Sequence, residues 1–113
     1  MGRELSIDGF ESVVAWRESL RAHWGGDPLA EDPDKLRALE GFCRFVEKTP
    51  DELVAYCFLR RRDSGERFAS KKRREELMAK LKNFASSSGL PVREARRSTS
   101  NVLSFLTHNG VLI

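Results

Sequence analysis

The chain has 113 residues, of which 33% are charged and 40% hydrophobic, and its formal net charge is +3. This length suits one globular domain that buries about two-thirds of the surface exposed by its unfolded chain. No window holds the roughly 20 apolar residues of a membrane span, and the start, MGRELSIDGF, is charged where a secretory signal is apolar. We therefore expect one soluble, cytoplasmic domain, residues 1–113, with no membrane partner.

Two helices are predicted in the first half of the chain. Residues 7–24 carry apolar side chains at steps of three and four, namely Phe10, Val13, Trp16, Leu20 and Trp24, and GGDP ends this helix. The second helix has Asp32 as its N-cap and Pro33 at its first helical position, and it runs to about Lys48.

A capping box predicts the start of the third helix. Thr49 and Glu52 have the T-x-x-E spacing in which each side chain accepts a backbone N–H, and Pro50 lies at the first helical position. We expect this helix to last to about Arg61. The stretch RRRDSGERFAS then reads as a polar connection, and because apolar and polar residues nowhere alternate over a sustained run, no strand is expected.

Two further helices complete the prediction. The fourth runs from about Ser70 to Ser87, with Gly89 as its C-cap and with Leu77, Met78, Leu81, Phe84 and Ala85 facing inward. Pro91 starts the fifth, which Asn109 and Gly110 close. The expected fold is therefore all-α, a small orthogonal bundle of about five helices.

The fifth helix is predicted to have one apolar and one polar side. At 100° per residue the apolar side collects Val92, Ala95, Thr99, Val102, Leu103 and Leu106. The opposite side collects Arg93, Arg97, Ser100, Asn101 and Ser104, with Arg96 on its flank. We expect the first side to pack against the bundle and the second to be free to bind a partner.

Little in the sequence indicates catalysis or a bound metal. Cys43 and Cys57 lie among apolar neighbours and are expected to be buried free thiols. His23 and His108 are isolated, so no metal site is expected. Nucleophile elbows, phosphate-binding loops and dinucleotide motifs do not occur. The chain is therefore expected to be no enzyme by itself and to need no cofactor.

The positive charge is concentrated in one part of the chain. Residues 1–59 hold 7 Lys or Arg and 12 Asp or Glu, whereas residues 60–97 hold 13 and 5. Such a basic region favours a polyanionic partner, for which nucleic acid is the commonest candidate. Because the apolar spacing assigns the aromatic residues to the core, duplex DNA is favoured over single strands.

A lysine and arginine run opens the fourth helix at the end where the helix dipole disfavours cations. This run is compatible with binding to a polyanion and, equally, with a solubilising surface whose cations pair with Glu75 and Glu76. Folding could nevertheless gather it with Arg60–Arg62 and the arginines of the fifth helix on one surface. The predicted DNA-binding residues are therefore Lys71, Lys72, Arg73, Arg74, Arg93, Arg96, Arg97, Ser100, Asn101 and Ser104.

From about Asp34 to Ile113 the chain resembles a known family. The stretches LRALEGFCRFVEKTPDELV and LMAKLKNFASSSGLPVREARRSTSNVLSFLTHNGVLI look like the N-terminal core-binding, or SAM-like, domain of tyrosine recombinases and phage-type integrases, especially those of archaeal type. The features that carry the resemblance are Phe42 and Phe45 before T-P-D-E-L, K-L-K-N-F ahead of Gly89, and S-F-L-x-x-N-G-V from Ser104.

The resemblance implies a non-catalytic role in DNA integration and recombination. Core-binding domains of this family form one half of a C-shaped clamp around duplex DNA, and the last helix, with Arg96 and Arg97, would lie along it. A separate catalytic domain of the same parent protein would supply the tyrosine nucleophile, and further recombinase protomers would join a synaptic complex. The chain is then expected to be an excised domain.

Two alternatives follow from the residues alone. One is a helical protein-interaction module whose basic surface meets an acidic partner, which would need an exposed apolar patch. The other is a helix-turn-helix transcriptional regulator in which the fourth and fifth helices cross steeply at the turn between Ser86 and Pro91.

Overall fold

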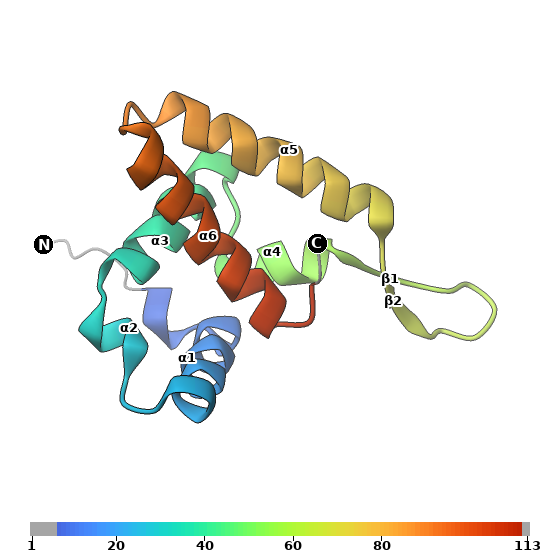
Figure 1. Ribbon diagram of the computed structural model, residues 1–113. Coiled ribbons are helices and arrows are strands. Elements are labelled where there is room, and N and C mark those ends of the chain that lie inside the picture. Colours follow the sequence, from blue (N-terminus) through green and yellow to red (C-terminus); the bar gives the residue numbers. More distant parts are fainter. Residues whose placement is uncertain (1–6, 112–113) are drawn as a thin grey trace, which may run out of the picture.

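Helices dominate the fold of residues 7–111, which are the part of the chain that the computed structural model describes (Figure 1). The α-helices are α1 (Glu11–Trp24), α2 (Pro28–Glu31), α3 (Asp34–Val46), α4 (Pro50–Tyr56), α5 (Lys71–Ser87) and α6 (Val92–His108). A 3-10 turn, Ile7–Gly9, precedes α1. The predicted all-α bundle is confirmed. Residues 1–6, part of the stretch compared above with a secretory signal, and residues 112–113 lie outside the described part.

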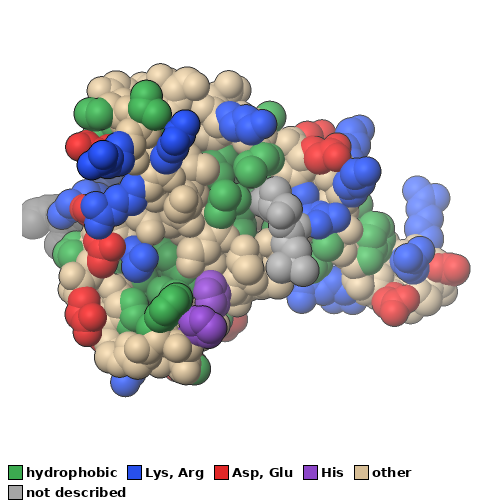
Figure 2. All heavy atoms as spheres, in the orientation of Figure 1, with side chains coloured by type: hydrophobic (Ala, Val, Ile, Leu, Met, Phe, Trp, Pro, Cys, Tyr) green, Lys and Arg blue, Asp and Glu red, His purple; other side chains and the backbone are tan. Residues whose placement is uncertain are grey.

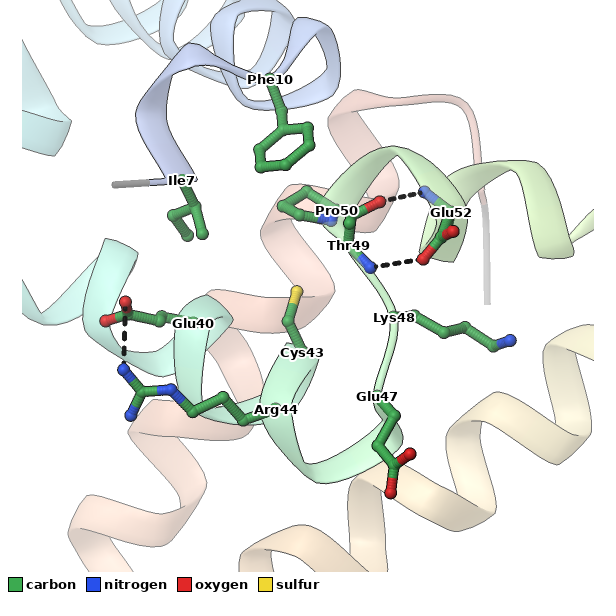
Figure 3. A pocket seen from close by; sticks show the side chains of 10 residues that line it. All are labelled: Ile7, Phe10, Glu40, Cys43, Arg44, Glu47, Lys48, Thr49, Pro50 and Glu52. Carbon is green, nitrogen blue, oxygen red and sulfur yellow. Dashed lines mark hydrogen bonds and ion pairs between the residues drawn. The ribbon is translucent and has the colours of Figure 1, made fainter. Parts of the chain in front are cut away.

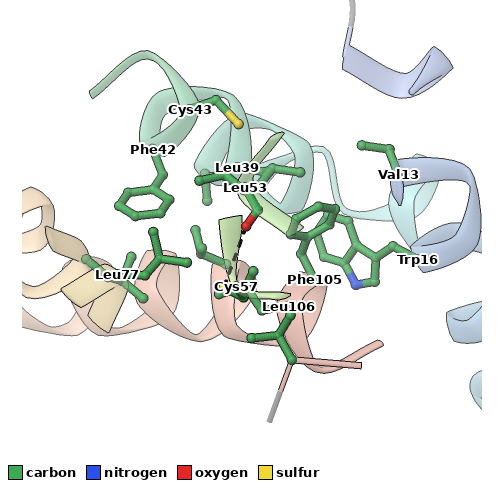
Figure 4. Packing of buried hydrophobic residues seen from close by; sticks show 14 of the residues in the cluster. Val13, Trp16, Leu39, Phe42, Cys43, Leu53, Cys57, Leu77, Phe105 and Leu106 are labelled. Atoms are coloured by element: carbon green, nitrogen blue, oxygen red, sulfur yellow. Dashed lines mark hydrogen bonds between the residues drawn. The ribbon is translucent and has the colours of Figure 1, made fainter. Parts of the chain in front are cut away.

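Helix α6 is the centre of the bundle, because α1, α3 and α5 all pack against it. Trp16, Phe42 and Phe105 are the largest fully buried side chains and meet in one core between these helices (Figure 4). The rings of Trp16 and Phe105 lie edge to face, with centroids 5.5 Å apart. None of the helices in residues 7–111 is long and apolar enough to cross a membrane.

The helix start predicted from the capping box at Thr49 is confirmed, whereas the predicted N-cap Asp32 of the second helix was wrong. The Thr49 hydroxyl accepts the backbone N–H of Glu52 at 3.1 Å, and the Glu52 carboxylate accepts the backbone N–H of Thr49 at 2.8 Å. Ser70 caps α5 in the same way by accepting the N–H of Arg73 at 3.2 Å. Gly89, at a φ of +75°, follows the C-cap Ser88 and lets the chain turn back toward α6.

The prediction that the chain has no strand was wrong. Helix α4 ends at Tyr56, well short of Arg61, and the strands β1 (Phe58–Arg60) and β2 (Arg67–Ala69) form an antiparallel hairpin. Figure 1 shows this hairpin projecting from the bundle between α4 and α5. Strands of three residues are too short for alternation to appear in the sequence. The segment predicted as a polar connection is therefore a structured arm.

The loop after α1 also holds more structure than the sequence predicts. Pro28 starts the one-turn helix α2, which buries Leu29 against the bundle. One turn shows no periodicity, so spacing could not reveal it. The next helix, α3, begins at Asp34 with Pro33 as its N-cap, while the predicted cap residue, Asp32, accepts the Asp34 N–H with its carboxylate at 3.2 Å.

Candidate nucleic-acid interface

The open side of α6 carries Arg93, Arg96 and Ser100. All three are exposed, and their spacing of three and four residues stacks them along one side of the helix. Within residues 7–111 neither arginine has an ion-pair or hydrogen-bond partner for its side chain. Both guanidinium groups are therefore available to an anion from outside the chain.

Two residues predicted on this open side point into the protein instead. Asn101 is only 6% exposed, and its Oδ1 accepts a hydrogen bond from Lys35 Nζ at 3.4 Å. The Ser104 hydroxyl accepts one from Trp16 Nε1 at 3.1 Å. The predicted face was wrong here because α6 has neighbours on three sides, so its polar residues meet α3 and α1. The predicted apolar stripe also omits Phe105, which is fully buried, and includes Val92, which is 68% exposed.

Arg97 is exposed but already has an acidic partner. Its Nη2 lies 3.5 Å from Asp32 Oδ2, and Lys35 Nζ lies 4.0 Å from the same oxygen. A DNA phosphate that bound Arg97 would have to displace the Asp32 carboxylate. Arg97 is therefore a weaker candidate for DNA contact than Arg93 and Arg96.

The basic run at the start of α5 divides into two pairs. Lys71 and Lys72 are exposed and have no ion-pair partner within residues 7–111. Arg73 is half-buried; its Nη1 donates to the Tyr56 carbonyl at 3.2 Å, and its guanidinium lies 4.7 Å from the Tyr56 ring centroid. Arg74 is also half-buried, and its Nε donates to the Ser70 carbonyl at 3.4 Å. The two lysines are therefore open to a ligand, whereas Arg73 ties α5 to α4.

Cations from α5 and α6 share one surface. Ser86, on the side of α5 opposite the buried Leu77, lines a shallow groove with Arg96 and Ser100 of α6. Lys71 and Lys82, placed fifteen and four residues before Ser86, lie on that same side of the helix. We call Lys71, Lys82, Arg93, Arg96 and Ser100 the α5–α6 face. Lys82 is a member that sequence reasoning missed, because a single lysine on a helix gives no signal of its own.

Figure 2 shows basic side chains along α5 and over the first half of α6, with acidic side chains between them on α5. Glu75 lies on the same side of α5 as Lys71 and interrupts the positive charge. Because α5 rises about 1.5 Å per residue, its 17 residues make the face about 25 Å long. The predicted convergence of the cations is thus partial: five of the predicted residues contribute to the face or adjoin it, namely Lys71, Lys72, Arg93, Arg96 and Ser100.

A cavity of about 620 Å³ lies between Ile7–Gly9, α3 and α4 (Figure 3). Four of its polar residues are paired within the protein: Glu40 with Arg44, and Thr49 with Glu52 in the capping box. Among residues 7–111 no group of three or more His, Cys, Asp or Glu side chains is placed to hold a metal ion.

The Cys43 thiol in this cavity is expected to resist alkylation. Burial, helped by the negative charge of Glu40, raises the pKa of the Cys43 thiol from 9.0 to about 12, and burial also raises the pKa of Cys57. At neutral pH this lowers the reactive thiolate fraction of Cys43 by about a thousandfold. Mass spectrometry after iodoacetamide treatment should find no label on the native protein and two labels after denaturation. Labelling of Cys43 in the native protein at the rate of free cysteine would contradict this.

No protein-family profile, curated protein or solved structure matches this chain. Its function is therefore inferred from the residues of the α5–α6 face and from the fold that positions them.

Proposed function

We propose that this protein is a duplex-DNA-binding module, the non-catalytic core-binding half of a tyrosine recombinase or phage-type integrase that acts in the cytoplasm. The observation that carries the proposal is the pair of exposed arginines without partners, Arg93 and Arg96, beside Ser100 on α6. Lys82 and Lys71 extend this positive surface along α5.

The chemistry of the face suits the DNA backbone. Arginine presents a planar fork that can bind a phosphate, or a guanine edge, through two hydrogen bonds. Lysine neutralises phosphates as a point charge, and a serine hydroxyl can donate to a phosphate oxygen. A face about 25 Å long corresponds to about seven base pairs of B-DNA at 3.4 Å each. The face thus matches most of one turn of a duplex.

The resemblance to core-binding domains supports the recombinase part of the proposal. In that family the last helix lies along DNA, and α6 is the helix that here carries the exposed arginines. A clamp needs a second half, so we propose that a catalytic domain of the same parent protein and further protomers are the protein partners, while the DNA chemistry belongs to that catalytic domain.

Salt dependence provides the direct test. If Lys71, Lys82, Arg93 and Arg96 each neutralise one phosphate, log K should fall with log salt at a slope of about −0.9 per contact, or roughly a hundredfold between about 50 and 200 mM salt. Fluorescence anisotropy with a labelled duplex measures this. We expect a single strand of the same length to bind more weakly, since the face offers no exposed aromatic ring for stacking. Absence of binding, or binding unaffected by salt, would contradict the proposal.

A second candidate is a module that binds an acidic protein, and one observation favours it. Leu90 and Val92, 46% and 68% exposed, line the groove beside Arg96 and could anchor an apolar side chain of a partner. Replacing both with serine should leave DNA affinity unchanged if the main proposal is correct. The helix-turn-helix alternative gains no support, because α5 and α6 run in nearly opposite directions in Figure 1 instead of crossing steeply.

A further inference from the structure

The hairpin of residues 58–69 stands apart from the bundle. Figure 1 shows it projecting beyond the start of α5, and the molecule is accordingly longer in one direction, 44 Å against 32 and 31 Å. The eight consecutive residues 60–67 are all exposed. Short two-stranded hairpins are marginally stable in water, so a projecting one needs stabilising contacts of its own.

The strand register places two arginines opposite each other. Arg60 pairs with Arg67, and Phe58 pairs with Ala69, so these four residues share one side of the ribbon. Like charges directly opposite each other destabilise a strand pair. Solubility does not require this arrangement, since lysine or glutamate would protect a strand edge as well. The paired arginines are better explained by an anion that binds between them.

Stacking holds the arginine side chains in place before any ligand binds. The Arg67 guanidinium lies 3.9 Å from the centroid of the Phe58 ring, on the side that carries Arg60. On the other side of the ribbon the Arg61 guanidinium lies 5.2 Å from the centroid of Phe68. Stacking leaves the N–H edges of the Arg67 guanidinium free for hydrogen bonds, whereas Arg61 also pairs with Glu66, with its Nε 3.8 Å from Glu66 Oε1. Little side-chain entropy would then be lost on binding.

The turn of the hairpin is ordered as well. The N–H of Arg61 donates to the Glu66 carbonyl at 2.9 Å, and the N–H of Gly65 donates to the Arg61 carbonyl at 2.8 Å. Arg60 Nη1 also donates to the Gly65 carbonyl, at 3.0 Å. Arg62 lies within this closed turn, is exposed, and has no ion-pair partner in residues 7–111. The arm therefore presents a free arginine at its tip.

We propose that the hairpin is a DNA-binding arm that enters the major groove about one helical turn away from Arg93 and Arg96. A two-stranded ribbon fits the major groove, which is about 12 Å wide. Arg93 and the hairpin lie beyond opposite ends of α5, and the 44 Å length of the molecule can span one turn of about 34 Å. The arm deepens the proposed function and rests on it, because it adds a second contact to the same duplex.

A triple variant tests the arm, with duplex length as the second variable. In R60Q/R62Q/R67Q we expect affinity for a duplex of about 24 base pairs to fall about tenfold and the salt slope to shrink by about two to three. A duplex of about 10 base pairs, one helical turn, cannot reach both contacts, so its affinity should stay within about twofold. Circular dichroism should show an unchanged helical bundle, since the three side chains are exposed and the contacts of Arg60 and Arg67 lie within the hairpin itself.

The control is R21Q/R37Q/R44Q, which removes the same charge from exposed positions on α1 and α3 and should leave affinity for both duplexes unchanged. The hairpin variant could bind both duplexes like the wild type while R93E/R96E loses binding. The proposal that the hairpin binds DNA would then be wrong, and the proposed function would stand. If the hairpin variant lost the same affinity for the long and the short duplex, the proposed distance of one helical turn between the hairpin and Arg93 and Arg96 would be wrong. If the wild type binds neither duplex, the proposed function itself is wrong and the arm with it.

Discussion

Replacing Arg93 and Arg96 with glutamate is expected to weaken duplex-DNA binding by about a hundredfold at low salt. Each change removes one of the two partner-free cations of α6 and places a carboxylate where a phosphate would lie. The loss should shrink as salt is added, because screening weakens both the lost attraction and the new repulsion. Fluorescence anisotropy titrations at several salt concentrations measure both effects.

The matched control for this variant is R21E/R44E. Both residues are exposed arginines outside the α5–α6 face, on α1 and α3, and reversing them changes the net charge by the same amount. If binding depended only on net charge, the two double variants would lose affinity equally. Equal loss would therefore show that the α5–α6 face is not the DNA-binding surface.

Replacing Phe105 with alanine is expected to cost about 3–5 kcal/mol of folding free energy. The Phe105 side chain is 0% exposed and packs edge to face on Trp16 at the centre of the bundle, so its removal leaves a cavity that three surrounding helices cannot easily fill. A domain of this size has a total stability of about 5–15 kcal/mol. Thermal unfolding followed by circular dichroism should show Tm lower by roughly 10–20 °C.

Thr107→Ala on the same helix is the control for Phe105→Ala, because the Thr107 side chain is exposed. It should change stability by no more than about 0.5 kcal/mol. A Phe105→Ala protein that melted together with the Thr107→Ala protein would contradict the central position of α6. The comparison also separates loss of DNA binding through unfolding from loss through a changed surface.

Local chemistry made much of the fold predictable. The capping residues Thr49 and Ser70 satisfy backbone groups within three residues, so their signal is complete in a short stretch of sequence. Burial of Cys43 and Cys57 was predictable for a similar reason, since each lies among apolar residues that are its neighbours in the sequence. Features of this kind do not depend on how the helices are arranged.

The features that the sequence could not predict depend on how the helices and strands are arranged in space. Whether Asn101 faces solvent depends on Lys35, 66 positions away, and the place of Ser104 depends on Trp16, 88 positions away. The hairpin depends on the pairing of two three-residue strands across a turn. Arg73 and Arg97 look like free cations in the sequence but have partners in α4 and beside α3. Only tertiary contacts separate the available arginines from the occupied ones.

Helix α6 both organises the core and offers its fourth side to the outside, and this limits how such a domain could diversify. Substitutions at Arg93, Arg96 or Ser100 would alter the preference for DNA sequences and would hardly change the folding free energy. Substitutions at Val102 or Phe105, which are fully buried, would instead cost several kcal/mol of folding free energy, a large part of the total stability. Variants with new sequence preferences should therefore differ along one narrow stripe of α6 and at the tip of the hairpin, while the interior stays the same.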